Sequence, residues 1–374
     1  MCYNTPMLYF DNASTTKIRE KSLEEYNKAS ELFYNPSAMY GVAGQVKQQI
    51  EDSRQYFLKT LKGKANSTLI FTGSATESNN AVLNTVITRK DKKYIFSAGE
   101  HSSVHNTAKH YKELGYNVVF IPLLDNGGIN EQALYKEVDE TTALVSIIHV
   151  SNETGAINNI KTITETVKAK NAQTLVHSDG VQALGKLDIN LKDLGVDFYT
   201  VSAHKINGPK GIGALYIANP NKFKPFIMGG GQELSLRAGT ENVPAVMAFK
   251  TALENLSKFD YYAHKQAILS NLSGDYVLVS NNNCVNNIIS LCFKGVRGET
   301  LQHMMESKGY LIGTGSACNS KVPINRVLEQ IVPKSYISGA VRISFGAEIT
   351  IEDCKNMAKE LSISAEIYTK RINK

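Results

Sequence analysis

Paired cysteines are missing from this chain. Its five cysteines are an odd number, and no two of them have the C-x-x-C spacing that zinc and iron–sulfur sites use. The sequence therefore argues against a disulfide framework and against a cysteine-ligated metal site. Any functional cysteine is expected to act alone. The cysteines lie at positions 2, 284, 292, 318 and 354.

Long runs of one kind of residue are missing as well. Nowhere do eighteen apolar residues follow one another, and residues 1–14 have neither the cationic region nor the long apolar region of a signal peptide. The formal charge of +6 arises from 41 basic and 35 acidic residues that are interleaved along the chain. This pattern indicates a mildly basic surface and not a nucleic-acid-binding stripe. We expect a soluble, cytoplasmic protein that binds no metal, no membrane and no nucleic acid directly.

What the chain does contain is a long alternation of strand-like and helix-like segments. Between residues 68 and 218, seven apolar runs are separated mostly by segments of helix length. This alternation predicts an α/β fold with a mainly parallel seven-stranded sheet and helices on both faces. The length of 374 residues exceeds the size at which one core stops growing, so two domains are expected.

Beyond residue 242 the pattern changes. Residues 243–259 have the spacing of one long amphipathic helix that starts beside a proline, and shorter strand and helix segments follow. Thr350 and Asp353 have the spacing of a capping box, which predicts the start of a final helix that runs to the C-terminus. These segments predict a second, smaller α/β domain.

The segment SAHKINGPKGIGALYI, residues 202–217, points most directly to chemistry. It places Lys205 in a glycine-rich turn between two strand-like runs, at one end of the sheet. Most lysines are solvated surface charges. Here, however, Ser202 and His204 can donate to an anion. A lysine among apolar strands also has its pKa lowered, so that it can act as an amine nucleophile toward an aldehyde.

Other polar residues follow strand-like runs in the same region. The segment GSATESNN, residues 73–80, starts a helix whose free N–H groups and hydroxyls form either a phosphate cradle or an ordinary N-cap. Asp179 could keep a pyridine nitrogen protonated, or could hold a turn. His101 could stack on a flat ring or move a proton, although a lone histidine is more often structural. Asn152 lies at another strand end.

Taken together, these residues describe a site for pyridoxal phosphate, because all of them fall at strand ends of one parallel sheet. The chain resembles the cysteine desulfurases of the NifS/IscS type, which are members of the class V aminotransferase family. The resemblance covers nearly the whole chain. It rests on the motifs YFDNASTT, NPS, SATESNN, EHSSV, SNETG, HSDGVQALGK, SAHKINGPKGIG, GGGQE, RAGTEN, GSAC and VRISFG.

The resemblance implies the fold and the division of the chain. The fold would be that of the pyridoxal-phosphate-dependent transferases of fold type I, with a mainly parallel seven-stranded sheet in the large domain. The large domain would span residues 15–255. Residues 1–14 and 256–374 would form the smaller α/β domain, which carries the Cys318 loop.

The resemblance also implies roles for residues around the cofactor, pyridoxal 5'-phosphate. Lys205 would bind it covalently, Asp179 would pair with its pyridine nitrogen, and Gln182 would pair with its ring hydroxyl. His101 would stack on the ring and help to move protons. The phosphate would be held by Ala75, Thr76, Ser202 and His204, and by Thr240 of a second subunit.

Asn152 and Arg342 would bind the carboxylate of the substrate. A guanidinium fork fits a planar carboxylate, and the alternative for Arg342 is a surface ion pair.

Cys318 decides which reaction the resemblance implies. It lies among small and polar residues, GTGSACNSK, after a strand-like run, which predicts an exposed loop. A cysteine thiolate there can take a sulfur atom from a substrate thiol and hold it as a persulfide. The alternative, a small buried hydrophobic residue, fits Cys284 and Cys292 better.

Some positions depart from the family pattern. Leu234 and Ser235 replace the usual arginine and glycine after GGGQE, and the histidine that often follows NPS is absent. These positions flank the expected site. We therefore expect activity to survive, while contacts between subunits or with partner proteins differ.

The sequence thus predicts a homodimeric enzyme that converts L-cysteine to L-alanine. It would pass sulfur from Cys318 to an acceptor protein, either an iron–sulfur scaffold or a tRNA-thiolating enzyme. One alternative is a selenocysteine lyase with the same site. Another is a plain class V aminotransferase, whose chemistry does not need GSAC. The third is a non-catalytic sulfur-relay scaffold, against which the intact Lys205, Asp179 and His101 argue.

Overall fold

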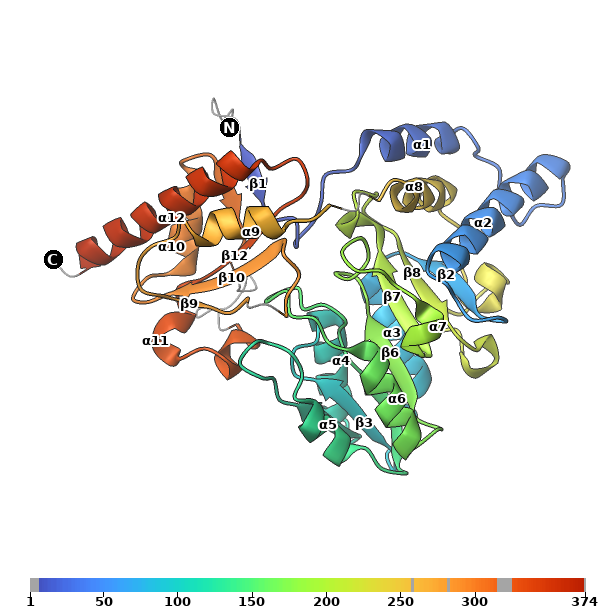
Figure 1. The fold of residues 1–374 in the computed structure, drawn as a ribbon. Helices are drawn as coiled ribbons and strands as arrows, with labels where there is room; N and C mark the ends of the chain where they lie inside the picture. Colours follow the sequence, from blue (N-terminus) through green and yellow to red (C-terminus); the bar gives the residue numbers. More distant parts are fainter. Residues whose placement is uncertain (1–6, 257–258, 281–282, 315–324, 373–374) are drawn as a thin grey trace.

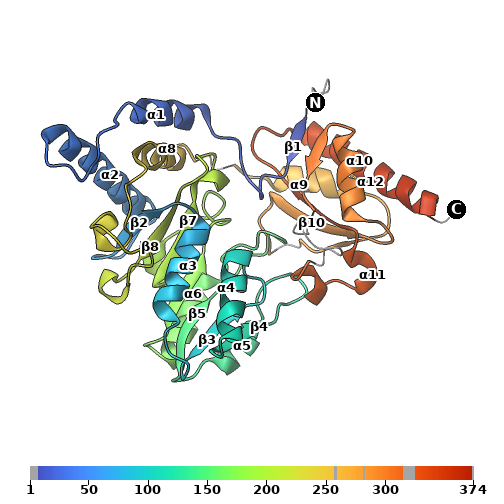
Figure 2. The same cartoon turned by 180° about the vertical axis from the view of Figure 1, so that it is seen from behind.

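The structure is a computed structural model, and it describes residues 7–256, 259–280, 283–314 and 325–372. Figure 1 shows two lobes, and Figure 2 shows the same lobes from behind. The larger lobe contains the central sheet, and the smaller lobe contains most of the C-terminal third of the chain together with the first strand.

A seven-stranded sheet forms the centre of the larger lobe. Its strands are β2 (Thr68–Thr72), β3 (Lys93–Ser97), β4 (Asn117–Ile121), β5 (Thr142–Ser146), β6 (Leu175–Asp179), β7 (Phe198–Ser202) and β8 (Gly213–Ile217). Their order in space is β2-β8-β7-β6-β5-β3-β4. Strand β8 is antiparallel to β2 and β7, and all other neighbouring pairs are parallel. The predicted α/β fold with a mainly parallel seven-stranded sheet is confirmed.

Successive side chains of these strands are buried on opposite faces of the sheet, as the period of two in a strand requires. In β2, Ile70 belongs to the core on one face, while Leu69 and Phe71 belong to the core on the other face. The first face is covered by α3 (Ala75–Val86) and α4 (Ser102–Glu113). The second is covered by α2 (Gly41–Thr60), α5 (Glu131–Glu137), α6 (Ile160–Lys170) and α8 (Val243–Glu254), with α1 (Glu20–Ser30) packed on α8.

The smaller lobe has its own sheets and its own core. An antiparallel sheet contains β9 (Tyr276–Leu278), β10 (Ile288–Phe293) and β12 (Ala340–Ser344), and β1 (Leu8–Phe10) pairs in parallel with β11 (Tyr310–Ile312). The helices are α9 (Tyr262–Leu269), α10 (Gly298–Glu306), α11 (Lys334–Ile337) and α12 (Ile351–Ile372). Phe10 is fully buried in this core, so the first strand packs with the C-terminal part of the chain. The division at residues 15 and 255 stays a prediction.

The ends of two helices test the sequence predictions. The capping box before α12 is confirmed, because the N–H of Asp353 donates to Oγ1 of Thr350 and the N–H of Thr350 donates to Oδ2 of Asp353. The prediction of one helix over residues 243–259 is wrong, because α8 ends at Glu254. The side-chain amide of Asn255 donates to the carbonyl oxygen of Thr251 at 2.8 Å and closes the last turn.

In the described ranges, none of the helices combines the length and the apolar character that a membrane span requires. The same ranges hold no cluster of three or more histidine, cysteine, aspartate or glutamate residues that could bind a metal ion.

Candidate active site

A cavity of about 550 Å³ lies where the parallel strands of the large sheet end. The carboxyl ends of parallel strands are the usual ligand-binding edge of an α/β sheet. Two of the predicted site residues are not part of the lining: Thr240 is exposed elsewhere on the chain, and Cys318 lies outside the described residues. All the others line the cavity: Ala75, Thr76, His101, Asn152, Asp179, Gln182, Ser202, His204, Lys205 and Arg342.

The N-terminus of α3 forms one wall of the cavity. Ser74 is the N-cap of this helix, and its hydroxyl accepts from the N–H of Glu77 at 3.2 Å. The next two residues, Ala75 and Thr76, are at the start of the helix, where N–H groups have no partner within the helix. Gly213 of β8 lies against them, and a Cβ at this position would be 2.8 Å from the backbone nitrogen of Ala75. The wall therefore offers N–H donors and the positive end of a helix dipole to an anion.

Asp179 ends β6 and is 3% exposed. Its Oδ2 accepts from Nδ2 of Asn79 at 2.8 Å, and its Oδ1 accepts from the N–H of Val181 at 3.0 Å. Both oxygens are thus held in place at the floor of the cavity. A carboxylate in this position can pair with a protonated ring nitrogen.

His101 lies at the N-terminus of α4 and is its N-cap. Its Nδ1 is 2.8 Å from Oγ of Ser103 and accepts from the N–H of Ser103 at 3.2 Å. His101 is exposed toward the cavity, so one ring edge is held by the helix and the other is free for a ligand.

His204 follows β7 and lines the same cavity. Its Nδ1 is 3.1 Å from Oγ1 of Thr15. Burial, together with the positive charges of Lys205 and Lys210, lowers the pKa of His204 to about 4. The ring is therefore neutral near pH 7, and it is a hydrogen-bonding group rather than a cation.

Lys205 lies in the turn between β7 and β8, as the sequence predicts. Its Nζ donates to the carbonyl oxygens of Ala13 and Ser14, both at 2.6 Å. Burial, and secondly the positive charge of Arg342, lowers the pKa of this amine to about 8. A sizeable fraction of Lys205 is thus neutral near physiological pH, which is the form that attacks an aldehyde.

A second lysine lies close to the first. Nζ of Lys186 donates to Oε1 of Gln182 at 3.0 Å, and Nε2 of Gln182 donates to the carbonyl oxygen of Ala13 at 2.9 Å. Burial, and secondly the charge of Lys205, lowers the pKa of Lys186 to about 7. Lys186 does not line the cavity that contains Asp179 and His101. A low pKa alone would favour Lys186 as the reactive amine, and the geometry favours Lys205.

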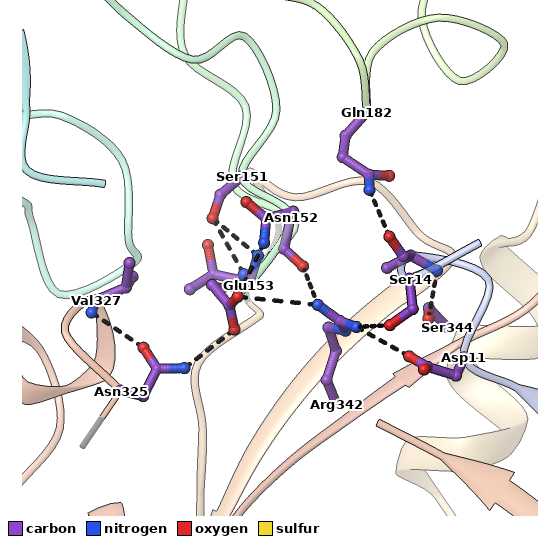
Figure 3. A network of polar contacts seen from close by, with 12 residues as sticks. Asp11, Ser14, Ser151, Asn152, Glu153, Gln182, Asn325, Val327, Arg342 and Ser344 are labelled. Atoms are coloured by element: carbon purple, nitrogen blue, oxygen red, sulfur yellow. Dashed lines mark hydrogen bonds and ion pairs between the residues drawn. The ribbon is translucent and has the colours of Figure 1, made fainter. Parts of the chain in front are cut away.

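Arg342 reaches the cavity from β12 of the smaller lobe and is 7% exposed (Figure 3). One Nη donates to Oδ1 of Asp11 at 2.9 Å and to Oγ of Ser14 at 2.7 Å. The other Nη donates to the carbonyl oxygen of Asn152 at 2.9 Å. Nε is buried and has no hydrogen-bond partner among the described residues, so the guanidinium keeps a donor for a carboxylate.

Glu153 lies between Arg342 and Asn325 (Figure 3). Its Oε1 is 3.9 Å from Arg342 and accepts from Nδ2 of Asn152 at 2.8 Å. Its Oε2 accepts from Nδ2 of Asn325 at 3.0 Å. The carboxylate of Glu153 therefore connects Arg342 to Asn325. Asn325 is the first described residue after position 314.

The comparisons with known proteins agree with this geometry. The family model described as aminotransferase class-V matches residues 8–357. The chain belongs to the class V aminotransferase family. Among its relatives, a protein named cysteine desulfurase IscS from Dictyoglomus turgidum is 33% identical in an alignment of length 364 that covers 92% of this chain and 91% of that protein. A NifS/IcsS protein homolog from Lactobacillus delbrueckii subsp. bulgaricus is 35% identical over 93% of this chain and 94% of its own length.

Solved structures show the same fold over nearly the whole chain. One titled NifS-like protein superimposes with a TM-score of 0.87 at 33% identity, over 96% of this chain and 100% of that chain. Another, titled SspA in complex with cysteine, gives a TM-score of 0.80 at 29% identity, over 90% of this chain and 98% of that chain. The predicted membership of the class V aminotransferases is confirmed.

The features of the cavity also fit a phosphorylated pyridine aldehyde, the class of cofactor that class V enzymes use. A buried carboxylate, an amine of lowered pKa and a helix N-terminus face one space. The glycine at position 213 leaves the helix N-terminus uncrowded. These features match the ring nitrogen, the aldehyde and the phosphate, respectively.

The sequence analysis did not identify four residues that form hydrogen bonds with the residues lining the cavity. Asn79, Ser103, Glu153 and Lys186 all lie within recognised motifs, SATESNN, EHSSV, SNETG and HSDGVQALGK. Each motif was interpreted through one or two of its residues. The other residues are polar at positions where α3, α4 and the strand ends face the core. Because buried polar groups are generally hydrogen-bonded, this polarity could have pointed to them.

Proposed function

We propose that this chain is a pyridoxal-phosphate-dependent cysteine desulfurase that holds its cofactor on Lys205. The observation that carries the proposal is the placement of an amine with a pKa of about 8 in the same cavity as Asp179, His101 and the N-terminus of α3. The cysteine desulfurase relatives, which align over nine tenths of the chain, support the choice of substrate.

Bound pyridoxal phosphate supplies a ring that withdraws electrons from the Cα of an amino acid. The residues of this chain hold and orient the reacting groups. Asp179 is already fixed by two hydrogen bonds, so it presents a negative charge to the ring nitrogen without reorganisation. The first N–H groups of α3 would hold the phosphate, and Gln182, which lines the same cavity, would pair with the ring hydroxyl.

Lys205 and Arg342 act on the substrate. Nζ of Lys205, once it is a free amine, accepts the Cα proton, and a pKa of about 8 suits a base that works near neutral pH. Arg342 binds the substrate carboxylate with its guanidinium, which lines the cavity and whose Nε has no partner in the described chain. The carboxylate is thereby fixed on the smaller-lobe side of the cavity.

Sulfur transfer requires a thiolate, and we assign this role to Cys318. Its sulfur attacks the sulfur of the substrate, so that an S–S bond forms while the Cβ–S bond breaks. The electron pair of the broken bond passes to the carbon skeleton, which takes up a proton and leaves as L-alanine. The persulfide on Cys318 then passes its outer sulfur to a thiol of an acceptor protein, such as an iron–sulfur scaffold or a tRNA-thiolating enzyme.

We also propose that the enzyme is a homodimer. Large apolar side chains are exposed on two segments that line one common pocket, residues 36–54 and 231–241. Met39 is fully exposed and Leu234 is 54% exposed, and Phe33, Tyr40 and Met228 near these segments are exposed as well. Such a patch fits a second copy of the chain. Thr240 is exposed at the end of the same region, where it could reach into the cavity of a partner subunit.

The direct test of the proposal is the reaction itself. The purified protein should contain pyridoxal phosphate and should form equal amounts of L-alanine and transferable sulfur from L-cysteine in the presence of a thiol. L-selenocysteine should be compared at the same concentration. Conversion of selenocysteine without conversion of cysteine would establish the selenocysteine lyase instead, and no conversion of either with bound cofactor would reject both.

The lowered pKa of Lys205 gives a pH dependence. Because the neutral amine attacks the aldehyde, the rate at which cofactor-free protein takes up pyridoxal phosphate should rise with pH, reach half of its maximum near the pKa of about 8, and level off above it. A lysine with the ordinary pKa of 10.5 would give a rate that still rises above pH 9. Stopped-flow absorbance at constant ionic strength measures this profile, and a rate that levels off only above pH 10 would contradict the assignment.

Replacement of Arg342 tests the carboxylate site. Arg342→Ala should lower kcat/KM for cysteine. The loss should correspond to about 2 to 5 kcal/mol of binding free energy, because one partner of a buried charge pair is removed. Most of the loss should appear in KM, while the absorbance of the bound cofactor persists. Arg297→Ala changes an exposed arginine of the same lobe outside the cavity and serves as the control. An unchanged KM and kcat in Arg342→Ala would remove this residue from the substrate site.

A further inference from the structure

His101 is tied to a chain of buried polar side chains that lies behind it. Its Nδ1 is 2.8 Å from Oγ of Ser103, and this oxygen accepts from Nδ2 of Asn79 at 2.9 Å. The same Nδ2 donates to Oδ2 of Asp179 at 2.8 Å. Asn79, Ser103 and Asp179 are 0%, 8% and 3% exposed, so water cannot readily replace these partners.

Asp179 sets the direction of the first hydrogen bond. A carboxylate can only accept, so the atom of the Asn79 amide that faces it must be the nitrogen. Turning the amide over would place its carbonyl oxygen against the carboxylate, with two buried acceptors and no proton between them. Nδ2 of Asn79 therefore also donates to Ser103, and Oγ of Ser103 acts as the acceptor.

The hydrogen bond that Ser103 accepts from Asn79 determines that Ser103 donates its hydroxyl proton to His101. Its hydroxyl carries one proton, and among the described residues it is Nδ1 of His101, 2.8 Å away, that can accept this proton. The backbone N–H of Ser103 also donates to Nδ1, at 3.2 Å. A ring nitrogen that accepts cannot carry a proton, so the neutral ring of His101 must have its proton on Nε2. Within the described chain, Nε2 has no hydrogen-bond partner of its own.

We propose that Ser103 and Asn79 are positioning residues that hold His101 in the Nε2–H form, with the orientation set by Asp179. His101 then meets a ligand in the cavity as an N–H donor. It cannot take up a proton at Nε2 until it has given one away. The consequence for catalysis rests on the proposed function, whereas the tautomer is a property of the chain. The carboxylate that would pair with the ring nitrogen and the histidine that would stack on the ring are parts of one hydrogen-bonded unit.

The test is nitrogen NMR of the enzyme with its cofactor bound and its histidines labelled with 15N. His101→Gln identifies the His101 signals among those of the eight histidines by their loss. In the parent enzyme Nε2 of His101 should be protonated, and Nδ1 should be unprotonated and shifted by hydrogen bonding. Ser103→Ala should move the Nδ1 signal toward that of a weaker hydrogen bond, because only the backbone N–H remains.

Matched variants distinguish a role of Ser103 in positioning His101 from a general disturbance of the local structure. Ser103→Ala should also lower kcat about tenfold, the scale on which partners that orient a functional histidine act. Ser103→Thr keeps the hydroxyl and should restore both the signal and the rate. Ser102→Ala removes an exposed hydroxyl one position away and should change neither. Asn79→Ala should move the same Nδ1 signal, because nothing then forces the Ser103 proton toward the histidine.

Several results would overturn the proposal. A proton on Nδ1 in the parent enzyme would do so, and so would an Nδ1 signal that Ser103→Ala leaves unchanged. An Nδ1 signal that is insensitive to Asn79→Ala would remove the link to Asp179. Failure of the proposed function is read separately, since an enzyme that forms no alanine from cysteine still shows which nitrogen of His101 is protonated.

Discussion

Lys205→Ala should give a protein without covalently bound cofactor and without measurable desulfuration of cysteine. The amine of Lys205 lines the cavity and can attack the aldehyde, and it is also the base for the Cα proton, so both functions are lost together. The expected readouts are loss of the absorbance of bound cofactor and loss of the label after borohydride reduction. Alanine formation should fall at least about a thousandfold, as removal of a combined nucleophile and base does in other enzymes.

Lys186 supplies the control for this experiment. It lies one hydrogen-bonded step away through Gln182 and has the lower pKa, about 7. Lys186→Met should keep the borohydride label on Lys205, which peptide mapping detects. If the label in the parent enzyme maps to Lys186, then proximity to the cavity does not select the amine, and the assignment of Lys205 is wrong.

The large sheet could be predicted because its signal is local. Strands β2, β7 and β8 are short apolar runs buried on both faces, and turn residues separate the strand-like runs of the sequence from the helices. The position of Lys205 followed directly, since its glycine-rich turn lies between two such runs. The predicted helix over residues 243–259 was too long because apolar spacing continues past Glu254, while the side chain of Asn255 ends the helix.

The polar network of the site could not be predicted in the same way. Asn79 and Asp179 are a hundred residues apart in sequence, and Arg342 and Asp11 are 331 apart. Spacing in the sequence carries no information on such pairs. What the sequence does carry is the polarity of each residue, and only the folded sheet shows which polar residues share a hydrogen bond.

Leu234 and Ser235 were expected to alter contacts without removing catalytic groups. They follow Glu233, and residues 233 to 235 form one short 3-10 turn. Their φ angles are 45°, 59° and 63°, a region that residues other than glycine seldom adopt. The carboxylate of Glu233 is buried, 2.7 Å from Arg54, and it also accepts from the N–H of Phe71. This anchor holds the turn in place and leaves Leu234 exposed, so the departure from the family pattern falls on the surface proposed for the dimer.

Cys318→Ala should retain the cofactor, and the absorbance of that cofactor should still respond to added cysteine, because these steps depend on Lys205, Asp179 and Arg342. Alanine formation should nevertheless fall at least about a hundredfold, since no thiolate remains to attack the substrate sulfur. Selenocysteine could retain part of its turnover because the C–Se bond is weaker. Cysteine is therefore the decisive substrate.

The other cysteines make the test specific. Burial raises the pKa of Cys292 and of Cys354 to about 12, so these residues are almost entirely in the thiol form, which is a poor nucleophile. Cys284 is buried as well. Cys292→Ala and Cys354→Ala should therefore keep the parent rate per folded molecule, although the loss of buried sulfur atoms lowers stability. Radioactive sulfur from labelled cysteine should be found on Cys318 in the parent and both control variants. Recovery of that label on Cys284 or Cys292, together with parental activity of Cys318→Ala, would show that a different thiol accepts the sulfur.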